Sequence, residues 1–174
     1  MVYLTHYKSP IGKITLASDG KNITGLWLEG QKYFLASVKR ETRLENGLSV
    51  FKAAKTWLNE YFAGKNPSPA ILPLAPEGTV FRKKVWEVLL QIPYGTTISY
   101  GEIAKRLSLR NGGGRTSARA VGGAVGHNPI SIIIPCHRVI GADGGLTGYA
   151  GGTDKKIRLL KLEGAVLPCL KSKI

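Results

Sequence analysis

Residues 64–76 read GKNPSPAILPLAP, and this stretch decides how the chain is divided. It holds four prolines within ten residues, at positions 67, 69, 73 and 76. Proline lacks a backbone N–H and has a fixed φ, so this spacing excludes a regular helix or an inner strand. We interpret the stretch as a linker and expect two domains, residues 1–76 and residues 77–174.

The segment before the linker has the pattern of a small α/β domain. Short strand-like runs at 2–7, 13–18 and 23–28 are separated by turn residues such as those at 19–22. Residues 49–62 carry apolar side chains at the spacing of one helix face. These patterns predict an antiparallel sheet with a helix packed on it.

The segment after the linker is expected to begin with two helices. Apolar residues recur at helical spacing over 79–91, and Pro93 ends that helix. Ser99 and Glu102 have the spacing of a capping box, which predicts a second helix running to about Leu107.

A glycine-rich loop at 108–115 leads to a third predicted helix at about 116–125. Two helices joined by a loop, with arginines on the second, are typical of a helix-turn-helix, although an ordinary helical hairpin fits equally well. Residues 130–134 read as a buried strand and residues 153–162 as a final helix. The expected fold class is therefore α+β, a small N-terminal antiparallel sheet domain with helices and then a mostly helical domain with a helix-turn-helix.

The charge of the chain is strongly positive. There are 25 Lys and Arg against 11 Asp and Glu, a net charge of +14, of which +5 (10 − 5) falls before residue 77 and +9 (15 − 6) after it. Such a surplus favours polyanions, although a well-solvated basic surface is the plain alternative. No apolar run approaches the roughly 18 residues of a membrane span, and residues 1–7 lack the pattern of a signal peptide. We expect a cytoplasmic protein, a monomer, with no membrane contact.

The chain has only two cysteines, Cys136 and Cys169. Two are too few for a disulfide framework, and with three histidines they do not form a zinc-binding pattern. We therefore expect no metal and no cofactor. Cys169 stands outside any motif and is interpreted as structural or incidental.

Cys136 is the best candidate for chemistry. It follows an apolar run and Pro135, and it precedes His137 and Arg138. Most free cysteines are small buried hydrophobes. Neighbouring cationic groups favour the nucleophilic thiolate, however, and nearby glycines permit a ligand to approach the backbone. These residues predict a reactive cysteine without naming its substrate.

Residues 128–140, NPISIIIPCHRVI, resemble the signature of the O6-alkylguanine-DNA alkyltransferases. Residues 92–100, 118–124 and 149–152 match that family as well, and the resemblance spans residues 79–164. It implies repair of duplex DNA by direct reversal. An alkyl group would pass from O6 of guanine, or O4 of thymine, to Cys136 in one irreversible transfer, after the base has been flipped out of the helix.

The resemblance also implies roles for the residues around Cys136. Glu163 and His137 would form a relay that takes the thiol proton through a water molecule. Asn128 would brace the active-site turn, and Tyr100 would donate a proton or hydrogen bond to the departing base. Taken without the resemblance, Glu163 reads as a solvated charge at a helix end.

A second set of residues would contact the base and the DNA. Val139, Tyr149 and Ala150 match pocket positions, and Ala150 stands where some members have serine. Arg119 matches an arginine that enters the base stack, within a helix that lies in the minor groove. Phosphate contacts fit Arg115, and the small residues of that helix suit the narrow groove; they include Ala118 and Ala120.

The chain departs from the family pattern at two points, and two other functions remain as alternatives. Some members hold a structural zinc in the N-terminal domain, but this chain has no cysteine before Cys136. The loop at 111–115 is longer than the family pattern. One alternative is a non-catalytic protein of the same fold that recognises alkylated bases, although such proteins replace the cysteine. The other is a Cys-His hydrolase, for which adjacent Cys136 and His137 offer poor geometry.

Overall fold

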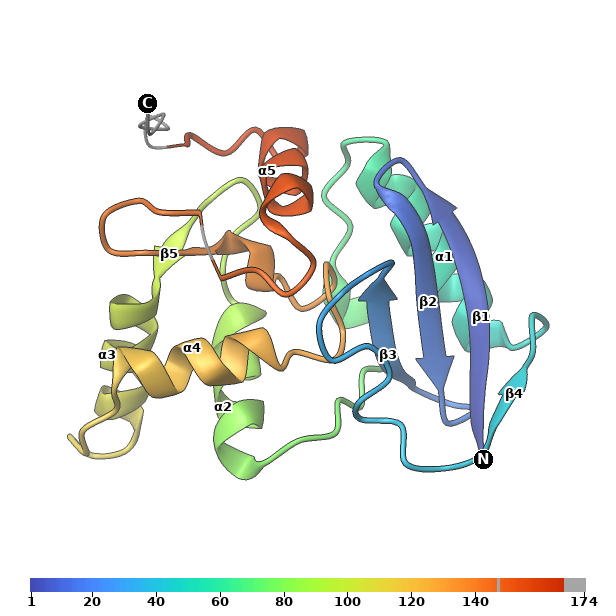
Figure 1. The fold of residues 1–174 in the computed structure, drawn as a ribbon, viewed down its shortest axis with the longest axis horizontal. Helices are drawn as coiled ribbons and strands as arrows, with labels where there is room; N and C mark the ends of the chain where they lie inside the picture. The colour runs from blue at the N-terminus through green and yellow to red at the C-terminus, as the bar shows by residue number, and fades with distance from the viewer. Residues whose placement is uncertain (147, 168–174) are drawn as a thin grey trace.

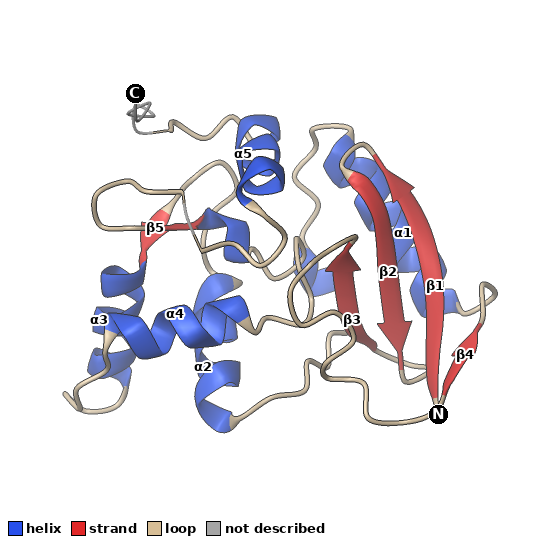
Figure 2. Ribbon diagram, viewed as in Figure 1, coloured by secondary structure: helices blue, strands red, loops and turns tan. Residues whose placement is uncertain are grey.

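The computed structural model describes residues 1–146 and 148–167. One side of the molecule is a four-stranded sheet covered by helix α1, and the other side holds helices α2 to α5 (Figure 1; Figure 2). The predicted α+β fold class is confirmed. Cys169, which was interpreted as structural or incidental, lies outside the described residues.

The N-terminal sheet has the order β3-β2-β1-β4. Strands β1 (Val2–Ser9), β2 (Gly12–Ser18) and β3 (Ile23–Leu28) are antiparallel neighbours and lie where the sequence predicted them. Strand β4 (Thr42–Leu44), which runs parallel to β1, was not predicted, because its three exposed residues carry no alternating pattern.

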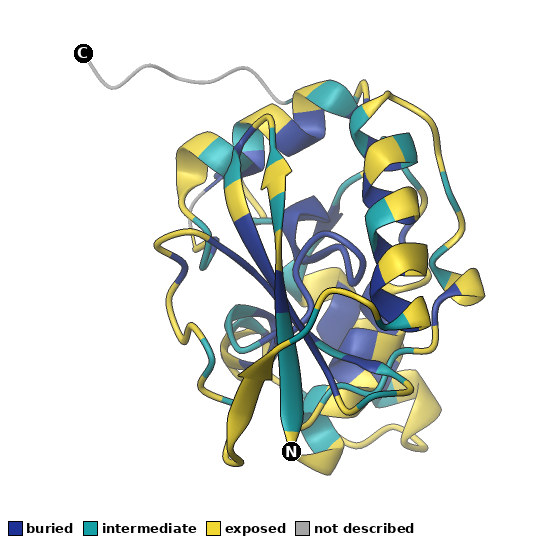
Figure 3. Cartoon of the chain, turned by 90° about the vertical axis from the view of Figure 1, so that its right-hand side faces the viewer, coloured by how far each residue is buried: buried dark blue, intermediate teal, exposed yellow. Residues whose placement is uncertain are grey.

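Helix α1 (Ser49–Phe62) covers one face of this sheet, with its apolar stripe turned inward (Figure 3). Phe51 and Leu58 of the helix and Leu16 and Leu26 of the sheet are fully buried in the same cluster. Burial of each such side chain contributes about 2 kcal/mol, which explains why the helix stays on the sheet.

The proline-rich stretch is irregular, as predicted, apart from the short 3₁₀ helix η1 (Pro69–Ile71). It also lies against the edge of the sheet, because Leu74 forms a bridge with Ile23. The carbonyl of Pro73 accepts a hydrogen bond from Ile23 N, a contact that needs no N–H from the proline. The apolar core is continuous across this stretch, so the division at residue 76 stays a prediction.

Helices α2 (Val80–Leu89), α3 (Tyr100–Arg110) and α4 (Ala118–Gly126) follow, and α4 packs on both α2 and α3. Their N-caps are Thr79, Ser99 and Ser117. The capping box is only half formed, since the Glu102 carboxylate turns to Arg106 instead, at 3.5 Å.

Helix α3 runs beyond its predicted end at Leu107, so the glycine loop begins at Asn111. Gly112 and Gly113 have φ of +72° and +92°, the left-handed region where glycine is favoured. The second sheet is a pair of two-residue strands, β5 (Ile98–Ser99) and β6 (Val139–Ile140), which run parallel. The final helix α5 (Thr153–Leu162) has its predicted bounds.

The strand predicted at residues 130–134 is wrong. The segment is fully buried, but only Ile130 makes a bridge, to Leu26, and the rest is a turn with Ile132 at φ +69°. Asn128 binds backbone groups of this segment that a neighbouring strand would otherwise pair. An apolar run predicts burial, and here turn hydrogen bonds and the Asn128 side chain, rather than a strand ladder, pair the buried backbone groups.

Candidate active site

Cys136 is the first residue of the 3₁₀ helix η2 (Cys136–Arg138) and is buried, with 3% of its surface exposed. Tight turns hold it on the N-terminal side: Ile133 N donates to Ser131 O and Cys136 N donates to Ile134 O, both at 2.8 Å. Burial raises the pKa of the thiol, although Asn128 and the charge of Lys156 act in the other direction. The thiol therefore needs a base before it can act as a nucleophile.

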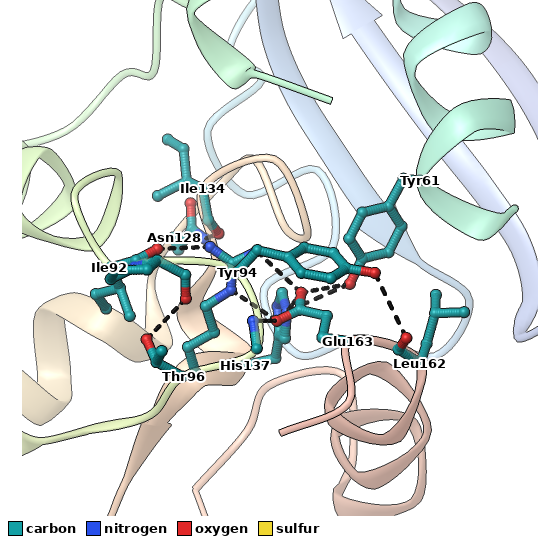
Figure 4. Close-up of polar contacts among 12 residues, drawn as sticks. Tyr61, Ile92, Tyr94, Thr96, Asn128, Ile134, His137, Leu162 and Glu163 are labelled. Carbon is teal, nitrogen blue, oxygen red and sulfur yellow. Dashed lines mark hydrogen bonds and ion pairs between the residues drawn. The ribbon is translucent and has the colours of Figure 1, made fainter. Parts of the chain in front are cut away.

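Asn128, which was predicted to brace this turn, makes side-chain hydrogen bonds to its backbone. Its Oδ1 accepts from Ile130 N at 3.0 Å. Its Nδ2 donates to Ile134 O at 2.8 Å (Figure 4). The side chain is buried, so without the amide Ile130 N would have no partner and Ile134 O would keep only the bond from Cys136 N. Asn128 thus holds both ends of the loop that leads to Cys136.

His137 and Glu163 come together as predicted, from η2 and from the end of α5. His137 Nε2 lies 2.6 Å from Glu163 Oε1, and both side chains are fully buried. Burial lowers the pKa of His137 against the opposing influence of Glu163, which favours the neutral imidazole. With Nε2 bound to the carboxylate, Nδ1 is left as an acceptor, and it has no partner among the described residues.

Arg138 completes the pair in a way the sequence did not predict. Its Nε donates to Glu163 Oε2 at 2.9 Å and its Nη2 donates to Glu163 Oε1 at 3.0 Å, while Nη1 donates to Ile92 O. Burial opposes ionisation of Glu163, but His137 and Arg138 outweigh it and hold the pKa of this carboxyl below its usual range. Arg138 was expected to favour the thiolate, and its charge is instead committed to Glu163.

The cation that acts on Cys136 is Lys156, which the sequence analysis missed. Lys156 is 1% exposed, and its Nζ donates to Val139 O at 2.5 Å. Burial lowers its pKa to about 8, against the opposing effect of Cys136. A lysine in a helix that also carries exposed charges gives no sequence signal for this, because lysine is rarely buried.

Two tyrosines of the predicted site lie near the thiol. Tyr100, in the first turn of α3, and Tyr149 both have a raised pKa, caused first by burial and then by the charge Cys136 would carry. Both phenols therefore keep their protons. The Tyr149 hydroxyl is buried without a partner among the described residues. A Cβ added at Gly148 would lie 3.1 Å from the Tyr100 hydroxyl, so glycine leaves that hydroxyl room.

The remaining predicted base contacts are backbone groups. Val139 is buried and pairs with Ile98 across the short sheet, and its carbonyl is the one that Lys156 binds. Ala150 is half-buried, and its carbonyl accepts from Lys32 N at 3.0 Å. The carbonyls of both residues are thus already hydrogen-bonded within the protein.

The predicted DNA contacts lie on the surface. Arg119, Ala118 and Ala120 form the exposed first turn of α4, and Arg115 is exposed in the loop before it. Gly123 of the same helix faces open space. A helix start with one long cation among small residues can approach a duplex closely.

Two classes of site are not found in the described part of the chain. No three His, Cys, Asp or Glu side chains converge there to hold a metal ion. No helix among the described residues is long and apolar enough to cross a membrane.

Fold and site together define an α+β protein with a buried cysteine next to a histidine–glutamate pair. Two helices joined by a loop, α3 and α4, lie in the same part of the chain. Two family models match the chain, the ribonuclease-like domain of 6-O-methylguanine DNA methyltransferase over residues 2–76 and its DNA binding domain over residues 80–165. The chain belongs to the 6-O-methylguanine DNA methyltransferase family.

Similar proteins agree along nearly the whole length. A methylated-DNA–protein-cysteine methyltransferase of Methanosarcina acetivorans is 48% identical over 94% of this chain and 99% of its own. One of Haemophilus influenzae is 41% identical over 93% of this chain and 86% of its own. The crystal structure of Mycobacterium tuberculosis OGT in complex with DNA superimposes with a TM-score of 0.81 at 45% identity, covering 93% of this chain and 92% of that one. The chain is accordingly a DNA-binding protein of alkyl repair with methylated-DNA–protein-cysteine methyltransferase activity.

Proposed function

We propose that Cys136 takes an alkyl group from O6 of guanine in duplex DNA, once per molecule and irreversibly. The observation that carries this proposal is the buried His137, whose Nε2 is held by Glu163 and whose Nδ1 has no partner among the described residues. A buried thiol with a raised pKa needs such a base.

The proposed reaction is a direct displacement. His137 Nδ1 takes the Cys136 proton through a bridging water, and the ionised Glu163 stabilises the imidazolium that forms. The sulfur then forms a bond to the alkyl carbon as the bond from that carbon to O6 breaks. Tyr100 keeps its proton in this site and supplies it, or a hydrogen bond, to a guanine ring nitrogen as the base leaves. The product is a thioether, and no step regenerates the thiol.

Asn128 and the pocket residues have supporting roles in this proposal. Asn128 keeps the loop before Cys136 in place, and Tyr149 forms an aromatic wall of the base pocket. The backbone groups of Val139 and Ala150 read the base edge. Because Lys156 binds the Val139 carbonyl, that carbonyl shares its remaining lone pair with the base.

The buried position of Cys136 requires that the base leave the duplex, so base flipping is part of the proposal. Arg119 would fill the space in the stack. Ala118 and Ala120 would allow α4 into the minor groove, and Arg115 would meet a phosphate. The net charge of +14 supports binding to a polyanion. A pocket that recognises an alkylated oxygen beside a ring nitrogen also fits O4-alkylthymine, which we include as a second substrate.

The proposal extends to organisation and location. Residues 1–76 and 77–174 would form the two domains of a monomer, and the protein would work in the cytoplasm. A non-catalytic role in recognising alkylated bases is not favoured, because the chain keeps Cys136 together with its base. Transfer of a methyl group from a duplex oligonucleotide containing O6-methylguanine, measured as a mass increase on Cys136, tests the function; binding of that duplex without any mass increase would support the recognition role instead.

A further inference from the structure

Tyr61 reaches the active site from the other half of the molecule. It lies near the C-terminal end of α1, 1% exposed, and its hydroxyl donates to Glu163 Oε1 at 2.7 Å (Figure 4). The Tyr61 hydroxyl oxygen lies 3.4 Å from His137 Nε2. A side chain that the sequence presents as part of an apolar helix face is therefore bonded to the acid that holds the proposed base.

The position of this hydroxyl is fixed by aromatic packing. The Tyr61 ring stacks on Trp57, with centroids 5.4 Å apart, and meets the edge of Tyr94 at 6.2 Å. Trp57 is itself tied to the linker, since its Nε1 donates to Ser68 O at 3.1 Å. Burial, and then the charge of Glu163, raise the pKa of Tyr61 far above the working range, so the hydroxyl is always a donor.

The two carboxylate oxygens of Glu163 accept hydrogen bonds from different donors. Oε2 accepts from Arg138 Nε and from Gly95 N, at 2.9 and 3.2 Å. Oε1 accepts from Arg138 Nη2 and Tyr61, and it is the oxygen that His137 uses. How strongly Oε1 binds the imidazole therefore depends on how much of its charge Tyr61 takes up.

We propose that Tyr61 is a positioning residue for alkyl transfer, supplied by the N-terminal half of the chain. Its hydroxyl holds Glu163 Oε1 in place for His137 and moderates the pull of the carboxylate on the imidazole. This inference rests on the proposed function, because it assigns Tyr61 to the proton relay of that reaction. It also gives the N-terminal half a direct part in the chemistry.

Tyr61→Phe in the full chain tests the proposal, since it removes only the hydroxyl. Glu163 would then attract the proton of His137 more strongly, and the imidazole would be protonated up to a higher pH. An imidazolium cannot accept the thiol proton, so the acidic limb of the rate profile should move to higher pH. With O6-benzylguanine as substrate, which needs no flipping, we expect a rate loss of roughly tenfold near pH 6 and a smaller loss near pH 8.

A stronger donor should have the opposite effect. Placing 3-fluorotyrosine at position 61 keeps the ring and makes the hydroxyl a better donor, so the acidic limb should move to lower pH. Tyr7→Phe is the matched control: Tyr7 donates to Asn59 of the same helix at 2.7 Å, on the exposed side, and its loss should leave the profile unchanged. Thermal unfolding of each variant separates stability from rate.

The outcomes are distinct. Rate profiles that coincide with the wild type for both changes at position 61 would overturn the positioning role, whatever happens to stability. A shift of the acidic limb to higher pH in Tyr61→Phe, together with a shift to lower pH for 3-fluorotyrosine at position 61, would establish the positioning role. A wild-type protein that takes up neither a benzyl group from O6-benzylguanine nor a methyl group from duplex O6-methylguanine at any pH would instead remove the proposed function itself.

Discussion

His137 and Glu163 are joined by a 2.6 Å contact between Nε2 and Oε1, and neither side chain has any exposed surface. The contact fixes which nitrogen of the imidazole carries a proton and leaves Nδ1 as the acceptor. Four further donors bind the carboxylate, two from Arg138 and one each from Tyr61 and Gly95, and His137 and Arg138 hold its pKa low. The relay is thus built from four separate parts of the chain that meet at one buried carboxylate.

Glu163→Gln should strongly destabilise the fold. It removes the charge that Arg138 needs, and an unpaired buried guanidinium costs about 3 kcal/mol or more in the free energy of unfolding. Urea denaturation measures this loss. Glu102→Gln, which removes the exposed partner of Arg106, should change stability by no more than about 0.5 kcal/mol. Equal losses in the two variants would show that the Glu163 cluster is not special.

The same carboxylate predicts how stability depends on pH. Its pKa is lower in the folded state than in the unfolded chain, so it contributes stability that is fully present above the unfolded pKa of about 4.5. That contribution is lost as pH falls below this value. Urea midpoints between about pH 6 and pH 3 should therefore drop more steeply for the wild type than for Glu163→Gln. Parallel slopes would argue against a depressed pKa.

Asn128→Ala should loosen the loop before Cys136. Ile130 N would be left buried without a partner, at about 1–3 kcal/mol, and Ile134 O would keep only its bond from Cys136 N, a loss of about 1 kcal/mol. Urea denaturation should show a loss of roughly 2–4 kcal/mol. Asn59→Ala breaks only an exposed contact with Tyr7, and a loss as large as that of Asn128→Ala would contradict the bracing role.

Arg119→Ala should separate base flipping from chemistry. Only the duplex substrate needs its base extruded, so transfer from a duplex should slow by roughly tenfold or more, while transfer from free O6-benzylguanine should change less than about twofold. Single-turnover rates on both substrates measure this. Arg110→Ala, which removes an exposed arginine that donates to Gln91, serves as the control. Equal slowing on both substrates would exclude the flipping role.

Periodicity predicted most of the fold correctly. Strands β1 to β3 and helices α1 and α5 lie where their apolar spacing placed them, because each buries one regular face. The run 130–134 was misread, since burial alone does not distinguish a strand from a turn held by the amide of Asn128. Strand β4 was missed because it buries nothing.

The family signature points to His137, Glu163 and Asn128 as site residues, but not to the hydrogen bonds that Arg138 and Tyr61 make to Glu163. Tyr61 reads as a core aromatic and Lys156 as a surface charge until the fold brings them to the same place. Arg138 was assigned to the thiol because it is two residues away, while its side chain turns to Glu163. These roles depend on contacts between distant parts of the chain, which the spacing of residues in the sequence does not predict.

The central claim is that Cys136 is consumed by accepting an alkyl group from DNA. Intact-mass and peptide analysis after incubation with excess duplex containing O6-methylguanine test it most directly. The account predicts one methyl group per protein, located on Cys136, with restored guanine in equal amount and no uptake by Cys136→Ala. Continued repair beyond one equivalent, or methyl uptake that persists in Cys136→Ala, would contradict it.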